Sequence, residues 1–448
     1  MNKKVITTTG IIIVILILWF FVVGPILIDK GIIPPAPWEK NEGLVKEIQP
    51  FEPSSEGLNE KETNQGVYNS RFPEQKKEDA GKIGYSSELP ECPAGAIFNY
   101  FPVDKKDIVQ IIPVGLMVPP DHTFPAPHAY IYVIDPQHPT ENSANLYAPS
   151  DMTLKEIGFR RYKEIGPFKN YVDYTLTFSV CKDFDLYFIH VKSLIDPEIA
   201  EKAQQSLQKC NFQDLKIGDW CSDITDIKIK SGELIGTIGD AKAGIVGVDI
   251  GARDYRINGK DFIRPERNCD LKQRNPTDRC YSVCFFDYLK DELKSGLKFS
   301  DLGIERTTAP KCGSVYYDLK NTVQGNWFKK GLPVDPNQME DDFLFLGPDY
   351  LKPEIRVFSV GSSFSNLPSR LYFFNSKNSD YVNTDFKDVI ADGNIHCYEL
   401  KDAREGRSPE TFVVILQLTN ENTLNIERLD VASCSGTLKF SEPLVFER

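Results

Sequence analysis

Histidine is scarce in this chain of 448 residues, and several common cofactor and nucleophile motifs are missing. Only five histidines occur, and there is no Walker phosphate loop, no G-x-G-x-x-G nucleotide fingerprint and no G-x-S-x-G nucleophile elbow. No internal repeat or low-complexity tract stands out. These absences exclude the nucleotide-dependent enzymes and serine hydrolases that those motifs define.

Clustered basic residues are also lacking. Lysine and arginine total 52 against 64 aspartates and glutamates, which gives a formal net charge of −12, and the basic residues are scattered along the chain. Proteins that bind nucleic acid need basic clusters that neutralise phosphates. The composition therefore predicts no nucleic-acid partner.

Cysteine is present, but no Cys-x-x-Cys pair occurs, which excludes a zinc ribbon. The ten cysteines are even in number and all lie beyond residue 91. This usage is typical of disulfides in an oxidising, extracytoplasmic compartment. Near neighbours and plausible hairpin ends suggest three pairs: Cys210 with Cys221, Cys284 with Cys312, and Cys397 with Cys434.

An uncharged apolar segment lies near the N-terminus, from Val5 to Ile28. A helix needs about 20 apolar residues to cross the hydrocarbon core of a bilayer. No small-x-small cleavage pattern follows the run, which favours an uncleaved signal anchor over a cleaved signal sequence. Lys3 and Lys4 precede the segment and would hold the N-terminus in the cytoplasm. We therefore expect a single-pass cell-membrane protein whose bulk is extracytoplasmic.

Composition and patterning divide the chain into six parts. After the anchor, a polar stretch with few large apolar residues predicts a flexible stalk. Short runs of β-type sequence then alternate with turns, so the expected fold class is mainly β. The parts are a cytoplasmic tip (1–4), a transmembrane signal anchor (5–28), the stalk (29–90), a first β-domain (91–258), a disulfide-rich connector (259–340) and a small C-terminal β-barrel or sandwich (341–448).

The expected elements can be stated as ranges. Asp196 as N-cap and Pro197 at the first helical position predict a helix to about Lys209, and a second helix is expected near Tyr288 to Leu297. The expected strands are Ile108–Val118, Ala129–Ile134, Thr153–Phe159, Tyr171–Val180, Asp185–Val191, Ile224–Ile229, Leu234–Ile238 and Ile245–Ala252, then Leu371–Asn375, Thr411–Leu418 and Leu424–Leu429.

Four of the five histidines lie in the first β-domain, and three of them, His122, His128 and His190, fall within its stretch of alternating β-type sequence. Neutral imidazole is the commonest protein metal ligand and the usual general base near neutral pH, so this clustering suggests a site. A structural interpretation stays open, in which His122 and His128 flank a proline turn and His190 is a satisfied strand residue. His138, in a surface turn, and His396, beside Cys397, are more often structural or solvated than ligands.

Four sequence pieces occur in an order and spacing that resemble the lysostaphin-type zinc metallopeptidases, which are built on the duplicated-hybrid-motif β-fold. The resemblance spans roughly residues 119–254 and implies a β-sandwich or barrel. The pieces are His128-Ala-Tyr-Ile-Tyr132, Leu146-Tyr-Ala-Pro-Ser-Asp-Met-Thr-Leu154, Leu186-Tyr-Phe-Ile-His-Val-Lys-Ser-Leu194, and Ile229-Lys-Ser-Gly-Glu-Leu-Ile-Gly-Thr-Ile-Gly239 leading into Gly247-Val-Asp-Ile250.

The resemblance implies roles residue by residue. His128 falls on the family's first metal-ligand histidine, His190 on the histidine that acts on the attacked water, and Asp249 on a ligand histidine. Tyr132 falls on the aspartate of the family's H-x-G-x-D piece, and Gly247 falls on the first histidine of its H-L-H piece. Two functional positions are therefore kept, one is changed to another ligand type, and two are lost.

A catalytic zinc site usually has three protein ligands and an open position for water. His128 and Asp249 supply two, and His122, six residues upstream of His128 across a proline-rich turn, is a candidate for the third. Together with His190 as proton shuttle, these three residues would form a chemically reasonable site for one zinc ion. The alternative is a decayed site that has kept the scaffold for binding.

Three functions are compatible with these residues and motifs. The first, which is the function that we expect, is a non-catalytic or regulatory binding module for cell-envelope polymers or surface proteins. The second is a zinc-dependent endopeptidase that acts on cell-wall or surface peptides. The third is an adhesin or structural ectodomain in which the C-terminal β-domain binds.

Overall fold

A computed structural model describes residues 89–140, 142–162, 171–210, 219–257, 261–269, 279–334, 340–361, 367–377, 381–402 and 411–448. The expected tip, anchor and nearly all of the expected stalk lie outside these residues. Within them, no helix has both the length and the apolar character needed to cross a membrane.

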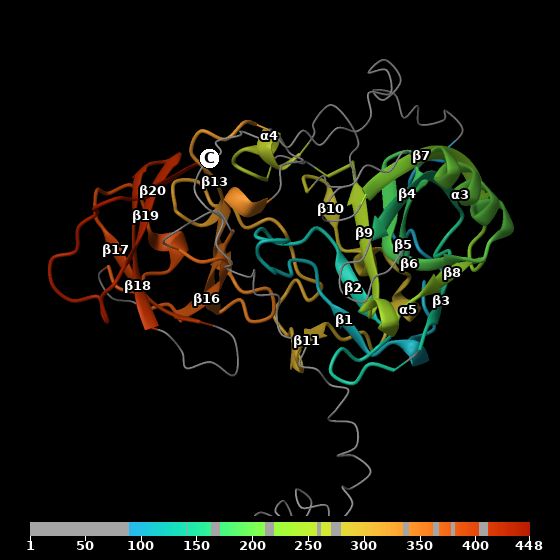
Figure 1. The fold of residues 1–448 in the computed structure, drawn as a ribbon, viewed down its shortest axis with the longest axis horizontal. Coiled ribbons are helices and arrows are strands. Elements are labelled where there is room, and N and C mark those ends of the chain that lie inside the picture. The colour runs from blue at the N-terminus through green and yellow to red at the C-terminus, as the bar shows by residue number, and fades with distance from the viewer. Residues whose placement is uncertain are drawn as a thin grey trace, which may run out of the picture. The chain divides into compact units, whose positions relative to one another are not determined.

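The described chain is mainly β (Figure 1). Its strands form a ten-stranded sheet, a closed eight-stranded barrel and a two-stranded sheet of β11 (Ser300–Asp301) and β12 (Ile304–Glu305). The ten-stranded sheet is antiparallel and runs β1-β2-β9-β6-β5-β4-β7, with β3, β8 and β10 paired beside this path. Its strands are β1 (Gln110–Ile112), β2 (Ala129–Tyr132), β3 (Ala144–Tyr147), β4 (Met152–Tyr162), β5 (Tyr171–Cys181), β6 (Phe184–Leu194), β7 (Asp219–Ile229), β8 (Leu234–Ile238), β9 (Gly247–Asp254) and β10 (Ser282–Val283).

Most expected strands of the first β-domain are present, but the first is much shorter than the range Ile108–Val118. It is reduced to β1 because Pro113 has no N–H to donate to a neighbouring strand. The next N–H, that of Val114, donates to the carbonyl of Cys312 in the connector. The chain therefore leaves the sheet after Ile112 and forms the loop that carries His122.

The barrel consists of antiparallel strands that follow one another in sequence, with β13 closing on β20. Large aromatic side chains such as Trp327, Phe358 and Tyr398 are fully buried in its apolar core, so side chains fill its interior. Its first strand comes from the range expected to be connector. The strands are β13 (Gly325–Lys329), β14 (Phe343–Pro348), β15 (Ile355–Val360), β16 (Arg370–Asn375), β17 (His396–Asp402), β18 (Thr411–Asn420), β19 (Thr423–Leu429) and β20 (Leu444–Glu447).

One of the two expected helices forms as predicted. In α3 (Pro197–Lys209) the Asp196 side chain accepts a hydrogen bond from the Ile199 N–H, as an N-cap does. The range Tyr288–Leu297 instead contains the end of a 3₁₀ turn (Phe285–Tyr288) and the single turn α5 (Asp291–Lys294). A longer helix is prevented because the Lys290 N–H donates to Phe98 O and Gly296 has a φ of 75°.

Five disulfides account for all ten cysteines. The three pairs expected from sequence are confirmed: Cys210–Cys221, Cys284–Cys312 and Cys397–Cys434. The remaining two are Cys92–Cys181 and Cys269–Cys280. This complete pairing indicates folding in an oxidising environment.

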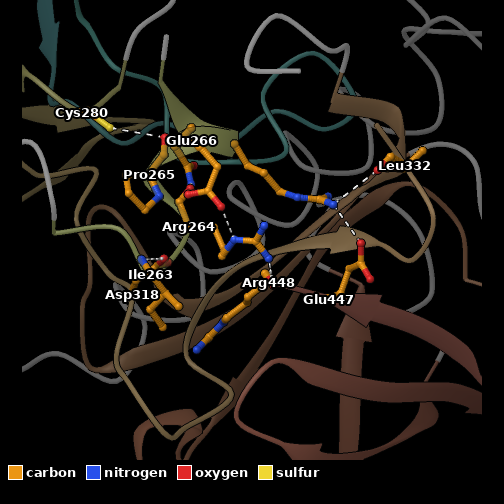
Figure 2. A network of polar contacts seen from close by, with 11 residues as sticks. Ile263, Arg264, Pro265, Glu266, Cys280, Asp318, Leu332, Glu447 and Arg448 are labelled. Atoms are coloured by element: carbon orange, nitrogen blue, oxygen red, sulfur yellow. Dashed lines mark hydrogen bonds and ion pairs between the residues drawn. The ribbon is translucent and has the colours of Figure 1, made fainter. Parts of the chain in front are cut away.

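A polar network around Arg448 ties the connector to the barrel (Figure 2). Arg264 donates to the backbone carbonyl of Arg448, and Arg267 forms an ion pair with Glu447 at 2.8 Å. The Arg448 guanidinium lies 4.0 Å from the ring centre of Trp327 and donates to the carbonyl of Gln324. Arg448 is only 2% exposed, so these contacts compensate for the burial of its charge.

We predict that Arg448→Ala lowers the free energy of unfolding by about 2–3 kcal/mol, because it removes a buried cation–π contact and hydrogen bonds to backbone carbonyls. Urea denaturation followed by tryptophan fluorescence measures the change. Lys439→Ala, at an exposed position, is the control and should change stability by less than about 0.5 kcal/mol. Equal stabilities of the two variants would contradict the assigned role of Arg448.

Candidate functional site

Strand β9 lies between β2 and β6 and brings the predicted site residues together. Asp249 is opposite Tyr130 on β2 and opposite Ile189 on β6. Because side chains alternate along a strand, Asp249 and Tyr130 share one face of the sheet, and so does His128, two residues before Tyr130. Every residue of β9 is buried, so Asp249 is held in the interior.

His190 joins this face through a β-bulge. Strict alternation would direct His190 to the face opposite that of Ile189 and Asp249. However, the register of β5 against β6 shifts between the pairs Tyr174–Val191 and Leu176–Phe188, which gives β6 one extra residue. His190 lies at this bulge and has a φ of 70°, a left-handed conformation that is rare for non-glycine residues. The bulge thereby re-aims the imidazole toward Asp249.

The atoms of three predicted site residues meet at the Asp249 carboxylate. Asp249 Oδ2 lies 3.4 Å from His128 Nε2 and 3.7 Å from His190 Nε2. The other nitrogen of His190, Nδ1, lies 2.7 Å from Asp173 Oδ2, which belongs to β5. The side chain of His190 is 30% exposed and those of His128 and Asp249 are 6% and 12% exposed, so solvent reaches the group through His190.

His122 lies beside His128, with 5.4 Å between the two ring centres. Its backbone pairs with Val118 through two hydrogen bonds of 2.9 and 3.0 Å, which close the loop. Nδ1 of His122 is buried and has no hydrogen-bond partner among the described residues. Buried polar atoms are nearly always paired, so this nitrogen is a candidate to bind a ligand.

Residues from the C-terminal part of the chain fix the His122 loop. The Glu340 carboxylate accepts a hydrogen bond from Phe124 N at 2.7 Å. The backbone carbonyl of Glu340 accepts one from Thr123 Oγ1 at 2.9 Å. Glu340 also forms a buried ion pair with Arg279. The Phe124 ring stacks on Phe343 of β14 at 4.6 Å. These contacts set the position of His122 from both the connector and the barrel.

Two further side chains, Tyr187 and Arg253, lie near His128. The Tyr187 hydroxyl lies 3.5 Å from His128 Nδ1, and the Arg253 guanidinium lies 4.5 Å from the Tyr187 ring centre. Tyr187 pairs with Gly251 of β9, where a Cβ atom would overlap the tyrosine ring. The glycine therefore makes room for the ring that contacts His128.

Burial keeps two of the imidazoles neutral. It lowers the pKa of His122 to about 4, helped by the positive charge of Arg279 and by His190. Burial also lowers the pKa of His128 well below its usual value, and His122 and His190 add to the effect. Neutral imidazole is the form that binds metal, so both rings are ready to act as ligands at neutral pH.

The opposite holds for His190. Burial alone would lower its pKa, but the carboxylates of Asp249 and Asp173 outweigh that effect and raise the pKa to about 9. Burial raises the pKa of Asp249 to about 6, against the influence of His190, which lowers it. At neutral pH without a metal, His190 is therefore a cation held between two carboxylates.

The donor types in this cluster fit zinc, which accepts imidazole nitrogen and carboxylate oxygen. His128 and Asp249 are adjacent donors, and His122 contributes a buried nitrogen that no described residue hydrogen-bonds. Across the described ranges, however, no group of three or more His, Cys, Asp or Glu side chains has the arrangement of a metal cage. A separate hollow between α3 and β7, lined by residues such as Glu198 and Asp226, contains none of the histidines.

Two of the family's functional positions differ here. Tyr132 and Gly247 pair with each other at the ends of β2 and β9, on the Asp249 face. Sequence reasoning missed Asp173, Tyr130 and Tyr187. A lone carboxylate within the β-type run of β5 was the available signal for Asp173, whereas the tyrosines look like ordinary strand residues.

Comparisons of the chain with protein-family models, with curated proteins and with solved structures give no match. The resemblance to lysostaphin-type peptidases therefore stays a prediction that depends on the motifs.

We predict that Gly251→Ala destabilises the protein by about 1–3 kcal/mol, because the added methyl group displaces the buried Tyr187 ring. Urea denaturation measures the loss. Gly95→Ala is the matched control, since no atom of the described chain lies within 4 Å of a Cβ at that position and its φ is not in the left-handed region. A fully stable Gly251→Ala variant would contradict the packing described for Tyr187.

A pH dependence follows from His190. Its pKa of about 9 in the folded state exceeds the usual 6.5, so the folded state binds more protons between these values. The stabilisation is complete below pH 6.5 and is lost as the pH rises through 9. In chelator-treated protein, the free energy of unfolding should fall from pH 7 to 9.5 by on the order of 1–3 kcal/mol.

The matched variant is His190→Asn, because asparagine tolerates a left-handed backbone. Urea titrations at several pH values should show a clearly flatter profile for this variant than for the wild type. Identical alkaline slopes would mean that His190 is not the group responsible.

Proposed function

We propose that the chain is an extracytoplasmic, metal-dependent hydrolase that cleaves peptide bonds, with a site of the lysostaphin type. One observation carries the proposal: the Asp249 carboxylate lies between His128 and a His190 that is fixed by Asp173. Such an arrangement combines a neutral ligand nitrogen, a ligand carboxylate and an oriented proton-transfer group.

Each residue has a distinct role in this proposal. His128 and Asp249 would hold a zinc ion together with a third protein ligand, for which the sequence predicted His122. Bound zinc lowers the pKa of a water to about 7 and polarises a carbonyl oxygen. Asp173 accepts a hydrogen bond from Nδ1–H of His190, which leaves Nε2 as the atom that exchanges a proton. The strained φ of His190 supports this assignment, because strained backbone residues cluster at functional sites.

The proposed location is the outer face of a cell membrane. Five disulfides support an oxidising environment. The apolar residues 5–28 would anchor the chain with residues 1–4 in the cytoplasm, and residues 29–90 would act as a stalk. Peptides of the cell wall or of surface proteins are then the accessible substrates.

A second candidate is a non-catalytic or regulatory module that binds cell-envelope polymers or surface proteins. The presence of Tyr132 and Gly247 at two of the family's functional positions favours it. The low exposure of His128 and Asp249 also favours it, because a polymer would reach only His190 directly. A third role, as an adhesin, would assign binding to the barrel.

Metal content and hydrolysis together test the proposal. The wild type should bind about one zinc per chain and cleave members of a mixed peptide library, as read by mass spectrometry. His128→Ala should lose the zinc. His190→Asn should keep the zinc but lose about 10²–10⁴-fold in hydrolysis rate, because only the proton transfer is removed.

His138→Ala is the control, because that imidazole is 82% exposed and its contact in the described chain is with Asp135. It should retain both zinc and activity. A wild type that binds no zinc and cleaves nothing would exclude the hydrolase and leave the binding role. Zinc that is retained by His128→Ala would show that the metal binds elsewhere.

A further inference from the structure

Tyr130 looks like an ordinary strand residue in the sequence, but in the structure it lies beside His128 and Asp249. It is directly opposite Asp249 in the register of β2 and β9 and is 7% exposed. Its hydroxyl oxygen lies 3.1 Å from His128 Nε2, and its ring meets the His128 ring edge-on at 4.9 Å between centres. His128 Nε2 therefore has two oxygen neighbours, the Tyr130 hydroxyl and the Asp249 carboxylate.

The contact of His128 with Tyr130 is a hydrogen bond and that with Asp249 has the spacing of an ion pair, and both spacings are compatible with atoms that bind one small cation. Two atoms bound tetrahedrally to zinc at 2.0–2.1 Å are separated by about 3.3 Å. The distances from His128 Nε2 are 3.1 Å to the Tyr130 hydroxyl and 3.4 Å to Asp249 Oδ2. His122 is the other candidate for the third ligand. It contacts the group through its ring, which packs against the ring of His128.

We propose that Tyr130, rather than His122, is the third protein ligand of a cation held by His128 and Asp249. The inference rests on the proposed function, because it assumes a metal at this site. When the tyrosine oxygen binds the metal, the phenolic proton is released to solvent. The resulting phenolate supplies an anionic oxygen, as the aspartate of the lysostaphin-type motif would have done at Tyr132.

This donor set has a consequence for metal choice. One nitrogen and two anionic oxygens are harder than two nitrogens and one oxygen, so the site should accept hard, strongly Lewis-acidic cations as well as zinc. Phenolate bound to Cu²⁺ or Fe³⁺ also gives a visible charge-transfer absorption. Cu²⁺ is therefore a direct probe for tyrosine coordination, independent of any hydrolytic activity.

The experiment titrates metal-depleted full-length chain with Cu²⁺ and, separately, with Zn²⁺ against a chromophoric chelator. The wild type should show the visible phenolate band. Tyr130→Phe should lose the band and bind Zn²⁺ at least tenfold more weakly. Tyr132→Phe is the matched control, since it removes a hydroxyl from the same face of β2, and His122→Gln tests the rival ligand. Both should keep the band.

The outcomes separate the inference from the proposed function. Metal binding that depends on His128 but gives no phenolate band, or that survives Tyr130→Phe unchanged, overturns the inference and leaves the proposed function intact. A tenfold loss of Zn²⁺ affinity in His122→Gln but not in Tyr130→Phe overturns it in favour of His122. A wild type that binds neither metal overturns both. Unchanged urea midpoints confirm that each variant is folded.

Discussion

The site depends on the left-handed backbone at His190. Regular alternation on β6 would send this imidazole to the face opposite that of Asp249, and the bulge reverses that direction. A non-glycine residue in this conformation costs of order 1–3 kcal/mol, so the surrounding contacts must hold it in place. The hydrogen bond from His190 to Asp173 and the nearby Asp249 carboxylate do so.

Burying so many titratable groups is expensive unless their charges compensate. The cluster meets this requirement because only one of its histidines is charged. His122 and His128 stay neutral, whereas His190 is a cation between Asp249 and Asp173. An apolar core would be simpler to fold. Titratable groups whose pKa values are shifted by burial and by specific charged partners are typical of functional sites, which supports the function proposed for the cluster.

Local sequence was enough to predict much of the scaffold and part of the site. The mainly β fold, the cap of α3 and three of the four disulfides between cysteines close in sequence follow from alternation, capping and proximity. The fourth, Cys269–Cys280, was not predicted although its cysteines are only 11 residues apart. Cys92–Cys181, separated by 89 residues, could not be foreseen because no local pattern links its ends. The approach of His128 to Asp249 was expected from the motifs. The bulge at His190 was not, because it reflects pairing with another strand.

The proposed chemistry depends on one assignment. In it, His128 and Asp249 are ligands of one metal ion that lies beside His190. X-ray absorption at the zinc edge of zinc-loaded, full-length protein examines those ligands without relying on activity. We expect imidazole nitrogen and oxygen donors at about 2.0–2.2 Å, with no sulfur. In the His128→Ala variant the imidazole scattering should be lost. A hydrated zinc without imidazole, or a sulfur shell, would contradict the assignment.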